Sequence, residues 1–174
     1  MKFFNFLPIF FLSAYTYSCS ELLDTEIRVL DSSETVNLCE YTNHVVLVVN
    51  VASRCGYTYQ YSSLQQLYES YKENDFVVLG VPSRDFMQEY SNEGDVAEFC
   101  STEYGVDFPM FATSKVRGKK ANALYKKLID QSGVSPSWNF NKYLITRDGK
   151  VASTFGSKVK PDSPELISKI KELL

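Results

Sequence analysis

The residues best suited to chemistry in this chain are Cys55 and its neighbours, in a polar turn that follows the apolar run 45–49. A run rich in β-branched residues that stops at such a turn predicts a buried strand, which would deliver the thiol of Cys55 to the start of a helix. The unpaired N–H groups at a helix N-terminus and the positive charge of Arg54 both favour the thiolate over the thiol. Because the flanking residues are polar or small, a reactive Cys55 is favoured over a structural cysteine packed in the core.

Strand and helix patterns alternate around Cys55. We expect strands at 27–30, 36–38, 45–51, 76–81, 143–145 and 151–155, extended segments at 108–111 and around 116, and helices at 58–73, 95–104, 121–130 and 163–174. The order strand–helix–strand indicates a parallel pair with a right-handed crossover, and Asp148-Gly149 predicts an antiparallel hairpin. The sequence therefore predicts an α/β fold, with a central mixed sheet flanked by helices. Cys55 would lie at the carboxyl end of a central strand, where open α/β sheets bind their ligands.

The composition argues against several classes of function. The formal net charge of the 174 residues is −3, and basic residues are scattered among acidic ones, so we expect no nucleic-acid partner. His44 is the single histidine, and neither Cys-x-x-Cys nor His-x-x-His spacing occurs. We therefore expect no metal site and no cofactor.

The first residues are typical of an export signal. Lys2 precedes an apolar stretch at 3–14, which small and polar residues follow up to Cys19. The stretch is too short for a stable membrane crossing. We therefore expect a signal segment, 1–19, and one folded domain, 20–174. The mature protein would be exported, either periplasmic or anchored to a membrane as a lipoprotein through acylated Cys19.

The four cysteines constrain one another. If Cys19 is cut off or acylated, Cys39, Cys55 and Cys100 remain, and three thiols cannot all pair. Either one stays free or two form a catalytic pair. Cys39 is interpreted as structural.

Three segments, in order along the chain, carry a family resemblance. They are Asn-Val-Ala-Ser-Arg-Cys-Gly-Tyr-Thr at 50–58, Leu-Gly-Val-Pro-Ser at 79–83 and Trp-Asn-Phe at 138–140. With these motifs the chain resembles the glutathione peroxidase family, on its cysteine-containing bacterial side, from about residue 36 to the C-terminus. The resemblance implies a thioredoxin-like fold and a thiol peroxidase that reduces hydrogen peroxide and organic or lipid hydroperoxides.

The resemblance also implies roles for three residues. Cys55 is the peroxidatic residue, whose thiolate attacks the peroxide and becomes a sulfenic acid. Trp138 and Asn139 match family members that hydrogen-bond the sulfur and the peroxide, and both side chains supply N–H donors. Without the family context, Trp138 would be interpreted as a core anchor and Asn139 as a turn residue.

One position departs from the family pattern. The family carries a glutamine that completes the catalytic group, and the residue here is Asp85. A carboxylate near the sulfur would disfavour the thiolate. Arg84 neutralising Asp85 is one solution, and Gln88 supplying the missing amide is the one that we favour over a solvated loop role for that residue.

Cys100 matches the place of the resolving cysteine in members reduced by thioredoxin. It would condense with the sulfenic acid of Cys55 into a disulfide, and a position facing the core of its helix would require local unwinding. The alternative is a buried structural cysteine. No cluster of arginines is evident for glutathione, and the link 130–138 is short. Both points favour a thioredoxin-like protein reductant over glutathione, and a monomer or weak dimer.

Two other functions fit a thioredoxin-like fold. A copper-delivery protein needs a second ligand near Cys55, yet position 59 is tyrosine and His44 precedes the strand. A disulfide-exchange protein needs a Cys-x-x-Cys pair, which is absent from the sequence.

Overall fold

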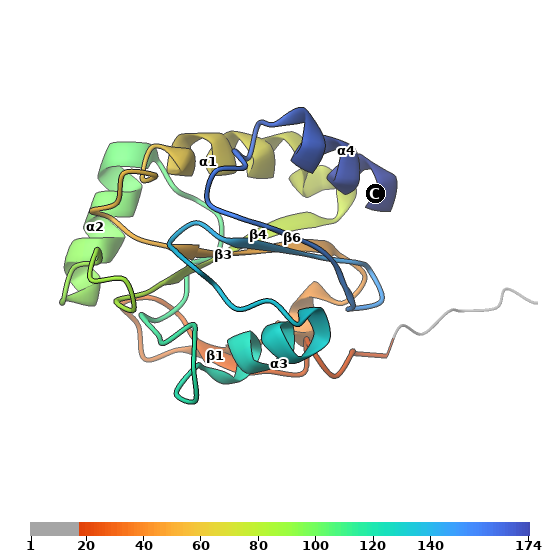
Figure 1. Cartoon of the computed structure of the whole chain (residues 1–174), viewed down its shortest axis with the longest axis horizontal. Helices are drawn as coiled ribbons and strands as arrows, with labels where there is room; N and C mark the ends of the chain where they lie inside the picture. Colours follow the sequence, from red (N-terminus) through yellow and green to blue (C-terminus); the bar gives the residue numbers. More distant parts are fainter. Residues whose placement is uncertain (1–17) are drawn as a thin grey trace, which may run out of the picture.

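The computed structural model describes residues 18–174, and its elements follow the predicted order (Figure 1). The strands are β1 (Glu26–Arg28), β2 (Thr35–Asn37), β3 (Val45–Val51), β4 (Phe76–Pro82), β5 (Lys142–Ile145) and β6 (Val151–Phe155). The α-helices are α1 (Gln60–Tyr71), α2 (Glu93–Tyr104), α3 (Ala123–Ser132) and α4 (Pro164–Leu173), and short 3-10 helices cover Leu38–Tyr41 and Lys72–Asn74.

The central sheet is mixed, as predicted. Its strand order is β4-β3-β5-β6, with β3 parallel to β4 and β5 antiparallel to both β3 and β6. Gly149 has φ 76°, which the Asp-Gly hairpin between β5 and β6 requires. The predicted hairpin of β1 and β2 forms a separate two-stranded sheet. This topology confirms the predicted α/β, thioredoxin-like class.

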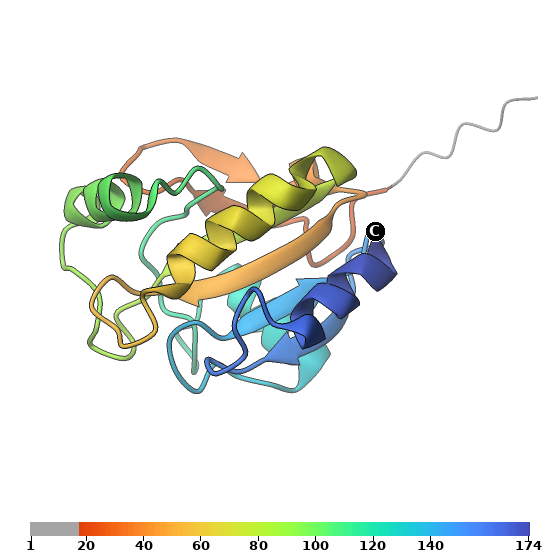
Figure 2. The same ribbon diagram turned by 90° about the horizontal axis from the view of Figure 1, so that it is seen from above.

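Helices cover both faces of the sheet, so every residue of β3 is buried. In Figure 1, α1 and α4 lie above the sheet and α3 lies below it. Val45, Leu47, Val49 and Val51 pack in the core shared with α1, α2 and α4, while Val46 and Val48 pack in the core shared with α3. Figure 2 shows α1 lying across β3, with α4 beside it.

Two helix ends lie where the sequence predicts them, whereas α1 and α3 each begin two residues later than expected. Gly105, with φ 59°, ends α2, and Ser163 caps α4 at Pro164. The extended segments expected at 108–111 and around 116 form no strand. Only isolated bridges join Met110 to Gly80 and Phe111 to Val29.

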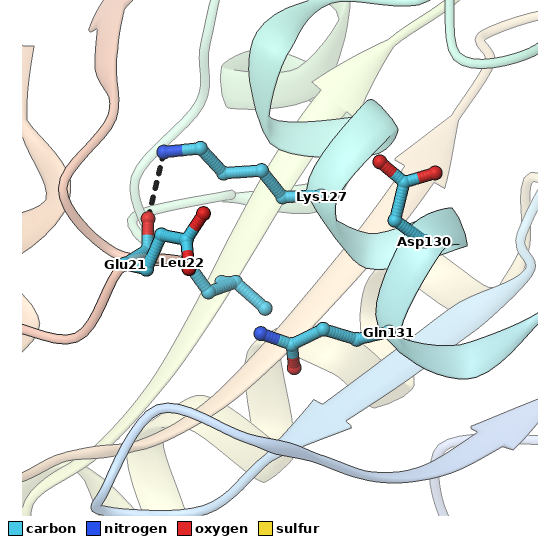
Figure 3. A pocket seen from close by; sticks show the side chains of 5 residues that line it. All are labelled: Glu21, Leu22, Lys127, Asp130 and Gln131. Carbon is cyan, nitrogen blue, oxygen red and sulfur yellow. Dashed lines mark hydrogen bonds between the residues drawn. The ribbon is translucent and has the colours of Figure 1, made fainter.

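The start of the described chain is fastened to the domain. A disulfide joins Cys19 to Cys39, and Cys55 and Cys100 are the free cysteines within residues 18–174. Lys127 of α3 donates to the Glu21 and Asp24 carbonyls at 2.7 and 2.8 Å, and Figure 3 shows the first of these bonds.

The expected signal segment lies mostly outside the described residues, which begin at residue 18. Within residues 18–174, no helix has the length and apolarity needed to cross a membrane.

Candidate active site

Cys55 lies in a series of tight turns between β3 and α1. Its backbone N–H donates to the Thr58 hydroxyl at 2.9 Å, and that hydroxyl lies 2.9 Å from the Ala52 carbonyl oxygen at the end of the strand. The Tyr57 N–H donates to the Cys55 sulfur at 3.4 Å. Since α1 begins at Gln60 rather than at the predicted Thr58, the donor to the sulfur comes from the turn and not from the first turn of the helix. The thiol is 9% exposed.

The segment at 138–141 is held against β3 by Asn50. The Asn50 amide donates to the Trp138 carbonyl at 3.0 Å, and its oxygen accepts from the Asn141 N–H at 3.1 Å. The Phe140 N–H donates to the Asn50 carbonyl at 2.6 Å, and Phe140 adopts a left-handed φ of 61°. Asn50 lies in the strand that leads to Cys55. This one residue therefore fixes the segment 138–141 next to the turn that carries Cys55.

Asn139 and Gln88 face each other within this arrangement. Asn139 is fully buried, and its amide donates to the Gln88 side-chain oxygen at 3.0 Å. The Gln88 carbonyl accepts from the Arg54 N–H at 2.9 Å. Gln88 therefore bridges the Cys55 turn and the Asn139 segment.

Trp138 lies at the rim of the site rather than in the core. Its side chain is 41% exposed, and its ring packs on Phe86 with centroids 5.3 Å apart. Within residues 18–174 its indole N–H donates no hydrogen bond, to the Cys55 sulfur or otherwise. A cavity of about 350 Å³ lies beside the ring, between Tyr57 and Lys158.

Asp85 is bound to its own partners. Lys115 pairs with its carboxylate at 2.8 Å, and the Val116 N–H donates to it at 2.7 Å. Burial opposes its ionisation, but these hydrogen bonds prevail and lower the pKa of Asp85 below its ordinary value. The cation that pairs with Asp85 is therefore Lys115, and not Arg84, the option that the sequence had offered beside Gln88.

A buried lysine supports the site and was not singled out from the sequence. Lys142 is fully buried, and its amine donates to the Gln60 side-chain oxygen at 2.8 Å and to the Phe140 carbonyl at 2.7 Å. Burial lowers the pKa of Lys142 to about 7. Through its two hydrogen bonds, Lys142 connects the segment that carries Asn139 to the start of α1. The available signal was a lysine at the first position of an otherwise apolar strand.

Cys100 lies on the inner face of α2, 2% exposed, in the same core as Cys55. Burial raises the pKa of its thiol to about 11. The thiol of Cys100 is thus shielded from solvent by the core that it shares with Cys55.

In the part of the chain that the structure describes, no three His, Cys, Asp or Glu side chains gather into a group that could hold a metal ion.

Comparison with known proteins places this site in a family. The glutathione peroxidase family model matches residues 22–129, a range that contains Cys55, Gln88 and Cys100 and ends before Trp138. The chain is 42% identical over 148 residues to a glutathione peroxidase of Lactococcus lactis subsp. cremoris, covering 82% of this chain and 93% of the relative. It is 40% identical over 158 residues to the hydroperoxy fatty acid reductase gpx1 of Synechocystis sp., covering 84% and 92%.

A solved structure agrees with these sequence matches. The crystal structure of Trgpx in apo form superposes with a TM-score of 0.70 at 34% identity, covering 87% of this chain and 94% of that one. On these matches, the chain belongs to the glutathione peroxidase family and is a thiol peroxidase.

Proposed function

We propose that Cys55 is the peroxidatic residue and that hydrogen peroxide and organic hydroperoxides are its substrates. The Cys55 thiolate attacks the distal peroxide oxygen, so that an S–O bond forms and the O–O bond breaks. The Tyr57 N–H stabilises the attacking sulfur, and the Asn139 amide, held by Gln88, is placed to hydrogen-bond the departing oxygen. The observation that carries the assignment is the hydrogen bond from the Tyr57 N–H to the Cys55 sulfur, in the turn after β3. Asn50 of β3 also bonds Trp138 and Asn141, on either side of Asn139.

The test is peroxide consumption by Cys55→Ser and Cys100→Ser. We expect Cys55→Ser to consume no peroxide above the rate without enzyme, while Cys100→Ser still consumes one equivalent and stops at the sulfenic acid. Undiminished turnover by Cys55→Ser would refute the assignment.

Cys100 is proposed as the resolving cysteine, with a thioredoxin-like protein as reductant in preference to glutathione. Its support is the shared core with Cys55. Mass spectrometry of peroxide-treated wild-type protein should show a 55–100 disulfide, which thioredoxin reduces faster than glutathione does. A lone sulfenic acid that glutathione reduces directly would contradict both points.

The preferred substrate is proposed to be a long-chain hydroperoxide with a carboxylate. A relative is named for hydroperoxy fatty acid reduction, and Lys158 borders the cavity beside Trp138. We expect kcat/KM for a hydroperoxy fatty acid to exceed that for tert-butyl hydroperoxide, and Lys158→Met to reduce the difference. Equal kcat/KM values for the two hydroperoxides would refute this substrate preference.

Export is proposed together with an unlipidated Cys19. The Cys19–Cys39 disulfide supports an oxidising compartment, since disulfides persist there. Intact-mass analysis of soluble and membrane fractions should find a soluble protein that retains Cys19, and light scattering should find a monomer or weak dimer. A protein whose N-terminus is an acylated Cys19 would refute the proposal of an exported, unlipidated protein.

A further inference from the structure

The turn that follows β4 presents a methionine to solvent. The Met87 N–H donates to the Arg84 carbonyl at 3.1 Å, which closes the turn 84–87. Met87 is 93% exposed and adopts a left-handed φ of 57°. A single exposed apolar residue is ordinary on a protein surface, but a long side chain in the left-handed region is not. Nothing in the core explains this placement, so its explanation is sought on the surface.

The turn beneath Met87 is anchored through Asp85. The Asp85 N–H donates to the Ser83 hydroxyl at 3.2 Å. The carboxylate of Asp85 accepts from the Val116 N–H at 2.7 Å and pairs with the Lys115 amine at 2.8 Å. Met87 is therefore presented from a segment that is fixed to the rest of the domain.

The exposed residues around Met87 are of the types that protein interfaces favour. Phe86, its neighbour in the chain, is buried under two of them. The Phe86 ring packs on the half-exposed Trp138 with centroids 5.3 Å apart, and the Arg117 guanidinium lies 5.4 Å from the centre of the same ring. Methionine, tryptophan and arginine are enriched in interfaces, and methionine adapts its shape to a partner. The rim surface is defined here as the exposed side chains of Arg84, Met87, Arg117 and Trp138.

The rim surface borders the peroxidatic site. Gln88 follows Met87 directly, and its carbonyl accepts from the Arg54 N–H at 2.9 Å, one residue before Cys55. Trp138 is the residue at the rim of the site described above. A partner seated on this surface is therefore next to the turn that carries Cys55.

The rim surface is positively charged, on a chain whose formal net charge is −3. Within residues 18–174, the guanidinium groups of Arg84 and Arg117 form no ion pair. A cavity of about 330 Å³ lies beside Arg84, and Thr113, Ser114 and Lys115 complete its lining. A carboxylate side chain fits a cavity of this kind, because an arginine with no anionic partner borders it.

We propose that the rim surface docks the protein reductant of this peroxidase, an inference that rests on the thioredoxin-like reductant proposed above. The reductant presents an acidic face, with a carboxylate side chain in the cavity beside Arg84 and an apolar side chain against Met87. A thiolate of its dithiol attacks one sulfur of the 55–100 disulfide, so that a mixed S–S bond forms and the 55–100 bond breaks. The second thiol of the reductant then displaces the mixed disulfide. Cys55 and Cys100 take up the two thiol protons, and the reductant leaves as a disulfide.

An acidic protein fits the rim surface better than an anionic membrane does. The apolar part of the surface is one methionine and part of one tryptophan, whereas a helix that lies in a membrane interface buries a broad apolar face. Both unpaired cations are arginines, whose planar guanidinium pairs with a carboxylate through two hydrogen bonds. Opposite charges on the two faces also speed the encounter of the two proteins.

The experiment compares thioredoxin with dithiothreitol as the reductant in steady-state peroxide turnover. The variants are the double variant Arg84→Glu, Arg117→Glu and the single variant Met87→Asn, since asparagine tolerates a left-handed φ. We expect kcat/KM for thioredoxin to fall about tenfold in the double variant and about threefold in Met87→Asn. Turnover with dithiothreitol, which needs no docking surface, should stay at the wild-type rate in both. Lys126→Glu, which reverses an exposed cation on α3, is the matched control and should equal wild type with either reductant.

The dependence on salt provides a second readout. Salt above about 0.1 M screens the attraction between exposed charges over distances beyond about 10 Å. The wild-type kcat/KM for thioredoxin should therefore fall as sodium chloride is raised, and that of the double variant should fall less. Turnover with dithiothreitol should show no such difference between the two proteins.

Each contrary outcome is distinct. If the variants match wild type with thioredoxin, the reductant docks elsewhere and only the docking surface is refuted. If they lose turnover equally with dithiothreitol, the substitutions damage the site and the docking role is refuted as well. If glutathione reduces the oxidised wild-type protein and thioredoxin does not, the proposed reductant fails together with its docking surface, before any variant is made. If wild type but not the double variant sediments with phosphatidylglycerol vesicles, while both have the same kcat/KM for thioredoxin, the surface contacts membranes instead.

Discussion

Lys142 stands out among single residues because its amine is buried without a carboxylate partner within residues 18–174. Its two hydrogen bonds go to neutral oxygens, of Gln60 and Phe140. A neutral amine has two hydrogens, one for each acceptor, whereas the ammonium form carries a charge that burial disfavours. Because burial disfavours the charged form, the pKa of Lys142 is about 7 and not the ordinary 10.5.

Lys142 should therefore make the stability depend on pH. Below about pH 7 both folded and unfolded chains hold its proton, and the full cost of burial applies. Between about 7 and 10.5 only the unfolded chain holds it, so the free energy of unfolding should rise with pH, by up to about 1.4 kcal/mol per unit. Urea unfolding at pH 7, 8 and 9 should show this rise in wild type and in Lys126→Met, an exposed control, but not in Lys142→Met. Equal slopes in all three proteins would refute it.

The residues at 85 and 88 allow a second test at this scale. Gln88 faces Asn139, while Asp85 is occupied by Lys115 and the Val116 N–H. Gln88→Ala should lower the second-order rate of Cys55 oxidation about tenfold, since it leaves the buried Asn139 amide without its partner. Asp85→Asn should keep that rate within about threefold and weaken the fold instead. Stopped-flow measurement of Cys55 oxidation by peroxide checks both rates. A larger loss of rate in Asp85→Asn than in Gln88→Ala would assign the catalytic role to Asp85 and not to Gln88.

Sequence reasoning reached the residues whose chemistry is local and missed those whose role depends on burial. Cys55 is recognisable from the apolar strand before it, whereas Trp138 and Asn139 are recognisable only through the family resemblance. Lys142 is an ordinary polar residue of the sequence until the fold removes it from water. Lys115 could not be identified as the partner of Asp85, because the two residues are distant in sequence and near in space.

Among the elements, α2 carries Cys100, the proposed resolving residue, on its buried face. Its N-terminus is capped by Asn92, whose side chain accepts from the Gly94 N–H at 2.7 Å. Removing such a cap costs about 1 kcal/mol, which raises the population of opened helix about fivefold. If opening limits resolution, Asn92→Ala should form the 55–100 disulfide about fivefold faster.

A matched control comes from α3, which contains no cysteine. Asn122 caps that helix by accepting from the Tyr125 N–H at 2.8 Å, so Asn122→Ala should lose similar stability with no gain in rate. Rapid acid quench measures the disulfide, and hydrogen exchange of the α2 amides measures opening. Faster exchange in Asn92→Ala without faster disulfide formation would show that opening is not limiting.

Element boundaries followed the sequence wherever a local signal fixes them. β3 spans the predicted residues 45–51, and Gly105 and Ser163 stand at helix ends. The segment 108–116, expected to be extended, forms only isolated bridges in the described part of the chain, from Met110 to Gly80 and from Phe111 to Val29. Strand propensity depends on context, so the apolar pattern does not specify how many ladder bonds such a segment makes.

At the scale of the whole molecule, the fastening of residues 19–25 lies at the end of the domain opposite the turn after β3 (Figures 1 and 2). The disulfide to Cys39 and the three bonds from Lys127, the last to the Thr25 hydroxyl at 2.9 Å, hold this segment. Spacing alone could not pair the cysteines, because the pairing depends on β1 and β2 bringing position 39 back to position 19. The fastening should therefore serve stability and leave the chemistry untouched.

The double variant Cys19→Ser, Cys39→Ser tests this separation of stability from activity. The two cysteines are 20 residues apart, and a cross-link of that span restricts the unfolded chain enough to contribute about 3 kcal/mol. Urea unfolding should show a loss of this size relative to wild type, whereas the rate of Cys55 oxidation at 25 °C should stay within about twofold. Replacing both residues avoids a lone thiol that could exchange with Cys100 and confuse the result. A large fall in oxidation rate with little loss of stability would instead mean that the N-terminal segment communicates with the site across the sheet.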